Sequence, residues 1–333
     1  MTSQNMKISV LIATRNRPQQ FSEALNSVLN QSYKNIEIII INDGSDEEHL
    51  NQYQIIESNA QSHIQFIYLP KRPNGHGPSF ARNAAAEKAT GEFLAFLDDD
   101  DLWNDSSHLE RFVQACHAAN KLELYFTNQK AIKADGTLVT TPLWLESLRD
   151  SAKNQLTITA STVKASAEWL LSAHGFSHLN CTIVKSALFK QVGGFDESLR
   201  YEEDKDLYWR LVDTADLIAF DTSYIAIHNV PDSRPSASNL LNELKKKETQ
   251  LHIAEKNLLR AKKLCLQKEC RQSEVYCCKG ISMLFSNAGS YKLAQYYAVR
   301  ALAAKFGVKW ALFTLFLLFK RILRGNDGKL YSS

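Results

Sequence analysis

The first hundred residues alternate between short apolar runs and segments with helical spacing. Four runs are nearly continuous in apolar and β-branched residues and are predicted strands: residues 8–12, 36–41, 64–69 and 93–97. Between them, residues 18–29 repeat apolar side chains at helical spacing, and residues 80–89 form an alanine-rich segment. Such strands, separated by helices, predict a mostly parallel sheet covered on both faces. The first part of the chain is therefore restricted to an α/β fold.

Polar residues follow these predicted strands directly. Thr14, Asp43 and Asp98 each stand just past the end of an apolar run. Right-handed crossovers place the carboxyl ends of parallel strands at one edge of the sheet. Ligands of open α/β sheets bind at that edge, so we expect these three side chains to converge on a ligand site.

Four consecutive carboxylates, residues 98–101, follow the last of these strands. Like charges in a row repel, so we expect them to lie in solvent or around a cation. A divalent metal bound to a nucleoside diphosphate would supply that cation, because hard ions prefer oxygen ligands. The alternative interpretation is a solvated acidic turn that caps the next helix.

The pattern is less regular after residue 105. A helix is predicted over residues 106–120, and residues 133–175 follow no clear pattern, with Trp144 and Trp169 as exposed aromatic candidates. Asp204 stands where a further helix begins. Short strands are predicted at residues 124–127, 179–184, 217–220 and 224–227, and His228 follows the last of them.

Charge divides the chain into two parts. Residues 239–333 contain 18 Lys and Arg against 6 Asp and Glu, whereas residues 1–238 contain 21 against 30. We therefore expect an acidic domain over residues 1–238 and a basic α-helical region over residues 239–333. A basic region favours an anionic partner.

The C-terminal region contains an intensely apolar run at residues 310–319, with basic residues on both sides. Ten apolar residues are too few to cross a bilayer, but residues 305–324 fit a helix that lies in a membrane interface. The alternative is an ordinary buried helix of a small all-α appendage. Nucleic acid is disfavoured, because the aromatic residues do not alternate with basic ones.

Cysteine usage and the N-terminus indicate a compartment. The six cysteines are scattered without a CxxC pair, which argues against a zinc site and for free thiols in a reducing environment. Residues 1–7 are polar and lack the apolar core of a secretion signal. We expect a cytoplasmic protein that is peripheral on the cytoplasmic face of a membrane.

Five ordered motifs together resemble glycosyltransferase family 2. They are residues 8–17, Ile41-Asn42-Asp43-Gly44-Ser45, Ala81-Arg82-Asn83, Leu97-Asp98-Asp99-Asp100-Asp101-Leu102-Trp103, and Val192-Gly193-Gly194-Phe195-Asp196-Glu197-Ser198-Leu199 followed by Glu203-Asp204. The resemblance covers residues 6–235. It implies a GT-A fold, with a Rossmann-like sheet, and inverting sugar transfer from a nucleotide-sugar.

The family pattern assigns roles to the acidic residues. It places the metal pair at Asp98 and Asp100, with Asp100 holding the metal and Asp98 the ribose or a metal-bound water. Asp99 and Asp101 are the alternate pair, and Asp99 is also a candidate donor-binding residue. Asp204 matches the position of the catalytic base, and Glu203 is its neighbour. The alternative for Asp204 is an acid that satisfies a helix N-terminus.

The remaining candidate residues concern the donor and the metal. Asp43 could accept the imide N–H of uracil or thymine, or cap a helix, and Thr14 could offer a hydroxyl to the same nucleoside. Arg82 could reach the phosphates or form a surface ion pair. His228 could complete the metal shell, or could be a structural histidine.

We therefore expect a metal-dependent inverting glycosyltransferase that uses Mn²⁺ or Mg²⁺ and, most consistently with Asp43, a UDP-sugar. The expected acceptor is a glycan or a lipid-linked saccharide in cell-surface polysaccharide synthesis, and the expected partner of the tail is an anionic membrane surface. A nucleotidyltransferase is the first alternative, but it typically has an early glycine-rich loop with basic residues. A catalytically degenerate, membrane-bound sugar-binding protein is the second, and the intact acids count against it.

Overall fold

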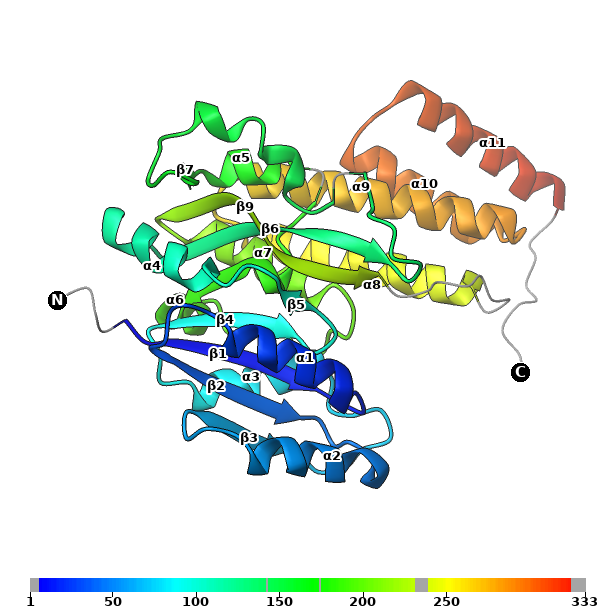
Figure 1. Cartoon of the computed structure of the whole chain (residues 1–333). Helices are drawn as coiled ribbons and strands as arrows, with labels where there is room; N and C mark the ends of the chain where they lie inside the picture. Colours follow the sequence, from blue (N-terminus) through cyan, green and yellow to red (C-terminus); the bar gives the residue numbers. More distant parts are fainter. Residues whose placement is uncertain (1–5, 142, 174, 231–238, 325–333) are drawn as a thin grey trace. The chain divides into compact units, whose positions relative to one another are not determined.

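A computed structural model of the chain describes residues 6–141, 143–173, 175–230 and 239–324 (Figure 1). Contacts divide the chain into two compact units, with the division between residues 232 and 233. The N-terminal unit is built from strands and helices, and the C-terminal unit is built from helices.

The described part of the N-terminal unit contains one sheet with helices around it. Its strands are β1 (Ile8–Thr14), β2 (Ile36–Asn42), β3 (Ile64–Tyr68), β4 (Phe93–Asp98), β5 (Leu102–Trp103), β6 (Leu124–Lys133), β7 (Thr162–Ala165), β8 (Thr182–Lys185) and β9 (Ile218–Val230). Its helices are α1 (Pro18–Leu29), α2 (Glu47–Ser58), α3 (Pro78–Lys88), α4 (His108–Ala118), α5 (Ala167–Leu171), α6 (Ser186–Gln191) and α7 (Glu203–Thr214). Short 3-10 turns lie at Glu146–Leu148, Ala152–Asn154 and Leu179–Cys181.

The strand order is β3-β2-β1-β4-β8-β6-β9-β5, and β7 pairs with β9. Strands β1 to β4 are parallel to one another, as the alternating sequence pattern predicts. In the second half, β8 runs antiparallel to β4 and β6, while β6 and β9 are parallel. The α/β class expected from the sequence is therefore confirmed, with a mixed second half.

One strand prediction was wrong, because the two short strands expected at residues 217–220 and 224–227 form the single strand β9. The polar residues 221–223 separate the two apolar runs in the sequence. In the structure Asp221 is buried, and it accepts hydrogen bonds from the hydroxyls of Tyr125 and Ser161 at 2.8 Å each. Partners on β6 and beside β7 thus satisfy the carboxylate inside the sheet.

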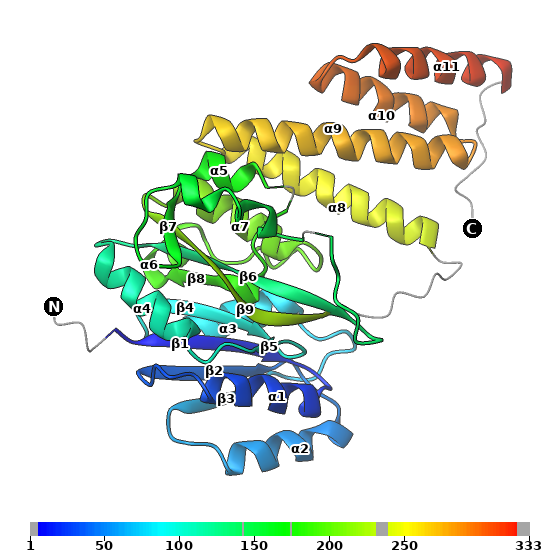
Figure 2. The same cartoon turned by 45° about the horizontal axis from the view of Figure 1, so that its top comes forward.

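Helices cover both faces of the parallel half of the sheet, with α1 and α2 on one side and α3 on the other (Figure 2). Alternate residues of β1, including Val10 and Ile12, pack with Phe21 and Val28 of α1 in one buried cluster. On helix α3, the small side chains of Ala81 and Ala85 are buried. Alternation along each strand therefore supplies both faces with apolar side chains.

The C-terminal unit consists of four described helices in succession: α8 (Asn239–Arg260), α9 (Leu264–Asn287), α10 (Tyr291–Ala304) and α11 (Val308–Arg324). Each packs against the next one along the chain. The turn between α9 and α10 contains Gly289 at φ +77°, a conformation that favours glycine. Gly289 thus separates two helices of this unit, whose α-helical character agrees with the expectation from the sequence. Cys277 and Cys278 are buried in its core as thiols rather than as a disulfide.

Helix α11 carries the apolar run and is only partly covered. Leu317 is fully buried against α10 residues Ala294 and Ala298. In contrast, large apolar side chains on the rest of its surface are exposed, among them Leu312, Leu315, Phe319, Ile322 and Leu323. No described helix has the length and hydropathy needed to cross a membrane.

Candidate active site

The ends of three neighbouring strands form one edge of the site. The register pairs Thr14 with Asn42, which precedes Asp43, and Ala13 with Asp98. Three side chains that are far apart in the sequence therefore lie at one level, as the parallel topology predicts. The backbone N–H of Asp43, directly after β2, donates to the carbonyl oxygen of Thr14 at 2.9 Å and so fixes the start of the next loop.

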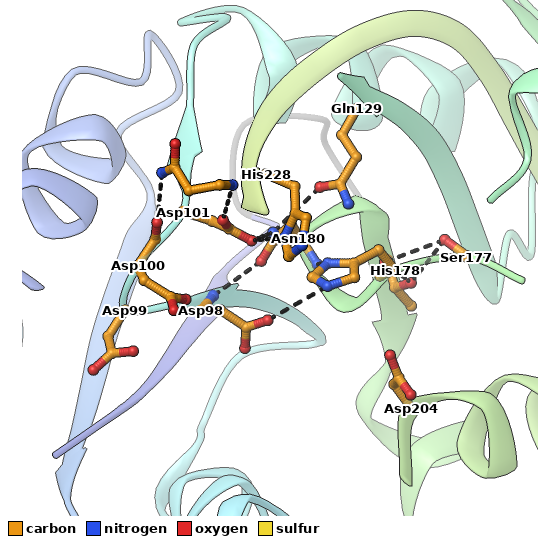
Figure 3. A network of polar contacts seen from close by, with 12 residues as sticks. Asp98, Asp99, Asp100, Asp101, Gln129, Ser177, His178, Asn180, Asp204 and His228 are labelled. Atoms are coloured by element: carbon orange, nitrogen blue, oxygen red, sulfur yellow. Dashed lines mark hydrogen bonds and ion pairs between the residues drawn. The ribbon is translucent and has the colours of Figure 1, made fainter. Parts of the chain in front are cut away.

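The four acids of residues 98–101 point in different directions (Figure 3). Asp98 is partly exposed and its Oδ1 lies 2.6 Å from Arg82 Nη2, while its Oδ2 lies 3.7 Å from His178 Nε2. Burial opposes ionisation of Asp98, but the charges of Arg82 and His178 hold the pKa of this carboxyl below its usual value. Asp98 is therefore a charged group in the site.

Asp99 and Asp100 share one cation. Asp99 is buried, and its Oδ2 accepts a hydrogen bond from the Thr14 hydroxyl at 2.7 Å. Arg17 Nη1 lies 3.2 Å from Asp99 Oδ1 and 2.6 Å from Asp100 Oδ2. Burial raises the pKa of Asp99 to about 6 and also raises the pKa of Asp100. The expectation that the acids lie in solvent or around a metal was therefore wrong for Asp99, because the Thr14 hydroxyl and the Arg17 guanidinium contact its two carboxylate oxygens.

Asp101 is fully buried beneath two histidines. It accepts hydrogen bonds from the Asn180 side chain and the Asn229 backbone, and its Oδ2 lies 2.8 Å from His228 Nδ1. Among the described residues, Asp101, His178 and His228 offer ligand atoms within 4.8 Å of one another. One carboxylate with two imidazoles suits a divalent transition metal. The expected metal residue His228 thus lies at the site, with Asp101 and His178 beside it.

Trp144 packs over this histidine pair. Its ring centroid lies 5.5 Å from that of His178 and 5.3 Å from that of His228. Its backbone has φ +52°, and a Cβ on Gly175 would lie 2.5 Å from Trp144 O, so glycine permits this close approach. Trp144 is half-buried, as is Trp169, whose ring packs on Phe220. The sequence expectation of two exposed aromatic residues was therefore wrong.

Asp43 organises a loop. Its carboxylate accepts the backbone N–H groups of His76 and Gly77 at 2.8 and 2.9 Å, and lies 2.8 Å from His76 Nδ1. A Cβ at Gly75 would lie 2.4 Å from Asp43 Oδ2. Helix α2 begins at Glu47, so Asp43 is not its cap. Its expected nucleobase contact stays a prediction, as does the nucleoside contact of Thr14, whose hydroxyl also lies 2.7 Å from Tyr53 Oη.

Asp204 lies in the first turn of α7, after a strained residue. Glu202 has the left-handed conformation at φ 55° and ψ 28°, which is uncommon for a non-glycine residue. Burial, followed by the neighbouring charge of Glu203, raises the pKa of Asp204 to about 7. A carboxyl with such a pKa is suited to exchange protons near neutral pH. Arg82 Nη1 lies 2.8 Å from Glu203 Oε1 and so joins this turn to Asp98.

A cavity of about 460 Å³ opens at the strand ends. Its lining includes Asp43, Asp98, Asp99, Asp100 and Glu203, together with the four arginines Arg15, Arg17, Arg82 and Arg200. Arg200 donates to the carbonyl oxygens of residues 74–76 at 3.0–3.2 Å, which braces the loop that Asp43 holds. Sequence reasoning assigned no role to Arg17, Arg200 or His178. Arg17 stood in a recognised motif, but the other two carried no local signal.

Known proteins resemble this chain in sequence. Residues 9–167 match the family model described as Glycosyl transferase family 2. An uncharacterized glycosyltransferase of Rickettsia typhi is 28% identical over 246 residues, which cover 72% of this chain and 69% of that protein. An uncharacterized glycosyltransferase of Nostoc sp. is 39% identical over 109 residues, covering 33% of this chain and 32% of that protein.

Solved structures resemble it in fold. Staphylococcus aureus TarS 1-349 in complex with UDP-GlcNAc has a TM-score of 0.62 at 18% identity, over 95% of this chain and 88% of that chain. The mannosyltransferase PcManGT from Pyrobaculum calidifontis, in complex with GDP-Man and Mn²⁺, has a TM-score of 0.54 at 15% identity, over 97% and 88%. The fold is thus of the GT-A type, and the protein is a glycosyltransferase. The match over residues 9–167 confirms the resemblance to glycosyltransferase family 2 that the sequence predicts.

Proposed function

We propose that this protein transfers a sugar, with inversion, from a nucleoside-diphosphate sugar to a hydroxyl group of a glycan or lipid-linked saccharide. The observation that carries this proposal is the linkage of Asp98, Arg82 and Glu203 beside the cavity, with Asp204 next in the chain. This linkage brings a donor cavity and a candidate base to the same edge of the sheet. The proposal extends to cell-surface polysaccharide synthesis as the process served.

The cavity is suited to a diphosphate group. Its four arginines line a space that is large enough for a nucleotide portion of the donor. Guanidinium groups bind phosphate oxygens through charge-assisted hydrogen bonds. Asp43 and Thr14, at the ends of β2 and β1, are the proposed contacts for the nucleoside, and a carboxylate at Asp43 favours a UDP-sugar. Arg82 and Asp98 are the proposed contacts nearer the phosphates and ribose.

A divalent cation, Mn²⁺ or Mg²⁺, fits the residues present. The family pattern assigns it to Asp100 and Asp98, with His228 as a candidate further ligand, and the compact group of Asp101, His178 and His228 lies next to Asp98. When bound, such an ion neutralises the negative charge that develops on the departing nucleoside diphosphate. The two ligand sets share His228 and differ in their other members, which are Asp98 and Asp100 in one set and Asp101 and His178 in the other.

Asp204 is the proposed base. Inversion requires a group that takes the proton of the acceptor hydroxyl as this oxygen attacks the anomeric carbon. Asp204, with its pKa raised to about 7, holds a proton strongly enough to accept one near neutral pH. Glu203, held by Arg82, supplies negative charge beside it. Arg82 therefore positions this turn as well as lining the donor cavity.

The proposed second contact of the protein is an anionic membrane surface, which would make it a peripheral protein on the cytoplasmic face. The support is the exposed apolar side of α11, with Leu312, Leu315 and Phe319. Residues 305–324 contain no acidic residue, and Lys309 and Lys320 stand at the ends of the apolar run. Exposed apolar side chains with basic neighbours are typical of interfacial helices.

A binding screen followed by product analysis tests the function. Nucleoside diphosphates and their sugars are screened by thermal shift with and without Mn²⁺, and a UDP-sugar should raise the melting temperature most in the presence of the metal. Transfer to an acceptor should release a nucleoside diphosphate. Release of pyrophosphate would instead indicate a nucleotidyltransferase. Absence of any nucleotide-sugar binding by calorimetry would favour the degenerate sugar-binding protein.

A further inference from the structure

Arg17 is one of the four arginines that line the cavity, and it also contacts the acidic run. It directly precedes α1, and its backbone N–H donates to Tyr53 Oη at 3.0 Å. The same Tyr53 hydroxyl contacts Thr14. The backbone at Arg17 is therefore fixed in the fold, while its side chain is about half exposed, at 48%, and borders the cavity.

A single nitrogen of Arg17 serves two acids. Nη1 lies 2.6 Å from Asp100 Oδ2 and 3.2 Å from Asp99 Oδ1. Arg82 is occupied separately with Asp98 and Glu203. Adjacent carboxylates repel one another unless a cation lies between them. Arg17 is thus the protein's own cation for the middle of the acidic run.

A divalent ion held by Asp100 needs oxygen atoms of that carboxylate, and Arg17 contacts one of them. Two cations cannot both lie close to one carboxylate oxygen without repulsion, so the guanidinium and the ion compete. A half-exposed guanidinium that leaves Asp100 still borders the cavity, where a donor diphosphate offers new anionic partners.

We propose that Arg17 is an exchangeable counter-ion, which neutralises Asp99 and Asp100 before the divalent ion binds and then turns to the donor's diphosphate. This inference rests on the proposed function, since it assumes that metal and diphosphate use this cavity. Arg17 is a positioning residue toward the acids and a binding residue toward the diphosphate. Removal of its charge should therefore raise the affinity for the divalent ion and lower the affinity for the diphosphate.

Arg15 provides a matched control. It lines the same cavity, but its Nη2 donates to the backbone carbonyl oxygens of Arg72 and Pro73, at 3.0 and 3.1 Å. No described carboxylate forms an ion pair with it. Replacement of Arg15 removes one positive charge from the cavity without freeing Asp100. The Arg15 variant therefore distinguishes the proposed exchange at Asp100 from a general effect of losing positive charge in the cavity.

The first measurement is Mn²⁺ affinity by titration calorimetry in the absence of nucleotide. Arg17→Gln and Arg17→Met should bind Mn²⁺ more tightly than wild type, by roughly threefold to tenfold, because a partly exposed ion pair no longer competes. Arg17→Lys should bind as wild type does, because one nitrogen atom contacts both acids. Arg15→Gln should change the affinity less than twofold. Circular dichroism checks that each variant is folded.

The second measurement is UDP affinity at saturating Mn²⁺. Both neutral Arg17 variants should bind UDP more weakly, by roughly threefold to tenfold, because a charge-assisted hydrogen bond is lost. Damage to the fold would weaken the binding of both ligands. Tighter Mn²⁺ binding together with weaker UDP binding is therefore specific to the proposed exchange. Arg17→Lys should recover most of the UDP affinity.

The outcomes are distinct. Tighter Mn²⁺ binding by both neutral Arg17 variants, with Arg15→Gln unchanged, supports the exchange. Equal or weaker Mn²⁺ binding by these variants overturns it, as does equal tightening by Arg15→Gln. If wild type binds Mn²⁺ and UDP while the Arg17 variants match it, only the Arg17 inference fails. If wild type binds neither ligand, the proposed function fails with it.

Discussion

Arg82 Nη1 lies 2.8 Å from Glu203 Oε1, so one side chain of α3 is joined to the first turn of α7. The other terminal nitrogen of Arg82 lies 2.6 Å from Asp98 at the end of β4. The guanidinium is largely buried between these two acids. Burial lowers the pKa of Arg82, but the charges of Asp98 and Glu203 outweigh burial and raise the pKa above its usual value. The candidate base Asp204 is therefore held relative to the acid of the donor cavity.

Replacement of Asp204 tests the proposed base. Asp204→Asn keeps the shape of the side chain but cannot accept the acceptor's proton, so transfer should fall by at least a factor of about 100. Binding of the nucleotide-sugar should stay within about threefold, because the change does not touch the arginines of the cavity. Transfer is measured by product analysis and binding by calorimetry. Full activity would remove Asp204 as the base. The exposed Asp216→Asn, beyond the end of α7, is the control.

The pH dependence of transfer follows from the pKa of Asp204, which burial and Glu203 raise to about 7. The base must be deprotonated, so kcat should fall about tenfold for each pH unit below 7 and level off above it. Rates are measured between pH 5 and 9 at saturating donor and acceptor. A rate that stays constant down to pH 5 would contradict this assignment.

The same pKa shift predicts an effect on stability. The folded-state pKa of about 7 lies above the ordinary aspartate value of 3.8, so the folded protein binds more protons between these values and loses stability as the pH rises through that range. At pH 8, Asp204→Asn should therefore melt a few degrees above wild type, roughly 2–6 °C after allowance for partial exposure. The difference should shrink toward pH 4. Thermal melts across pH measure it, and a lower melting temperature at pH 8 would disagree.

Metal dependence separates the two candidate ligand sets. EDTA should stop turnover, and Mn²⁺ or Mg²⁺ should restore it. Asp100→Asn should weaken Mn²⁺ binding by at least about tenfold if the family register holds. A comparable loss in His178→Gln, with little effect of Asp100→Asn, would instead assign the ion to Asp101, His178 and His228. Turnover that persists after chelation would remove the metal from the proposal. The exposed Asp135→Asn serves as a control.

The exposed side of α11 gives a prediction for membrane binding. Leu315→Glu with Phe319→Glu places charge where apolar side chains are exposed at 61% and 58%, and should reduce binding to vesicles that contain anionic lipid by at least about tenfold. Cosedimentation measures the bound fraction. The control is Leu259→Glu on α8, because Leu259 is 88% exposed but lies on another helix. An unchanged bound fraction in the double variant would exclude α11 as the contact.

The strands β1 to β4 and the helices α1 and α3 were predictable because they depend on local pattern. Residues 18–29 form α1 with the predicted bounds, and the first four strands lie where apolar runs stand. The error at β9 had a non-local cause, since the carboxylate of Asp221 is held inside the strand by groups far away in the sequence, among them Tyr125 and Ser161. The polar residues 221–223 do not reveal such partners in the sequence.

The sequence by itself determined that Thr14, Asp43 and Asp98 meet at one edge, because parallel strands with right-handed crossovers place their carboxyl ends together. Only the tertiary structure decided what each acid of the run faces: Arg82 for Asp98, Arg17 for Asp99 and Asp100, and His228 for Asp101. Consecutive residues after a strand leave the backbone in different directions, and their partners come from distant segments. Backbone periodicity therefore determines where the site lies, whereas tertiary packing determines which partner each acid contacts.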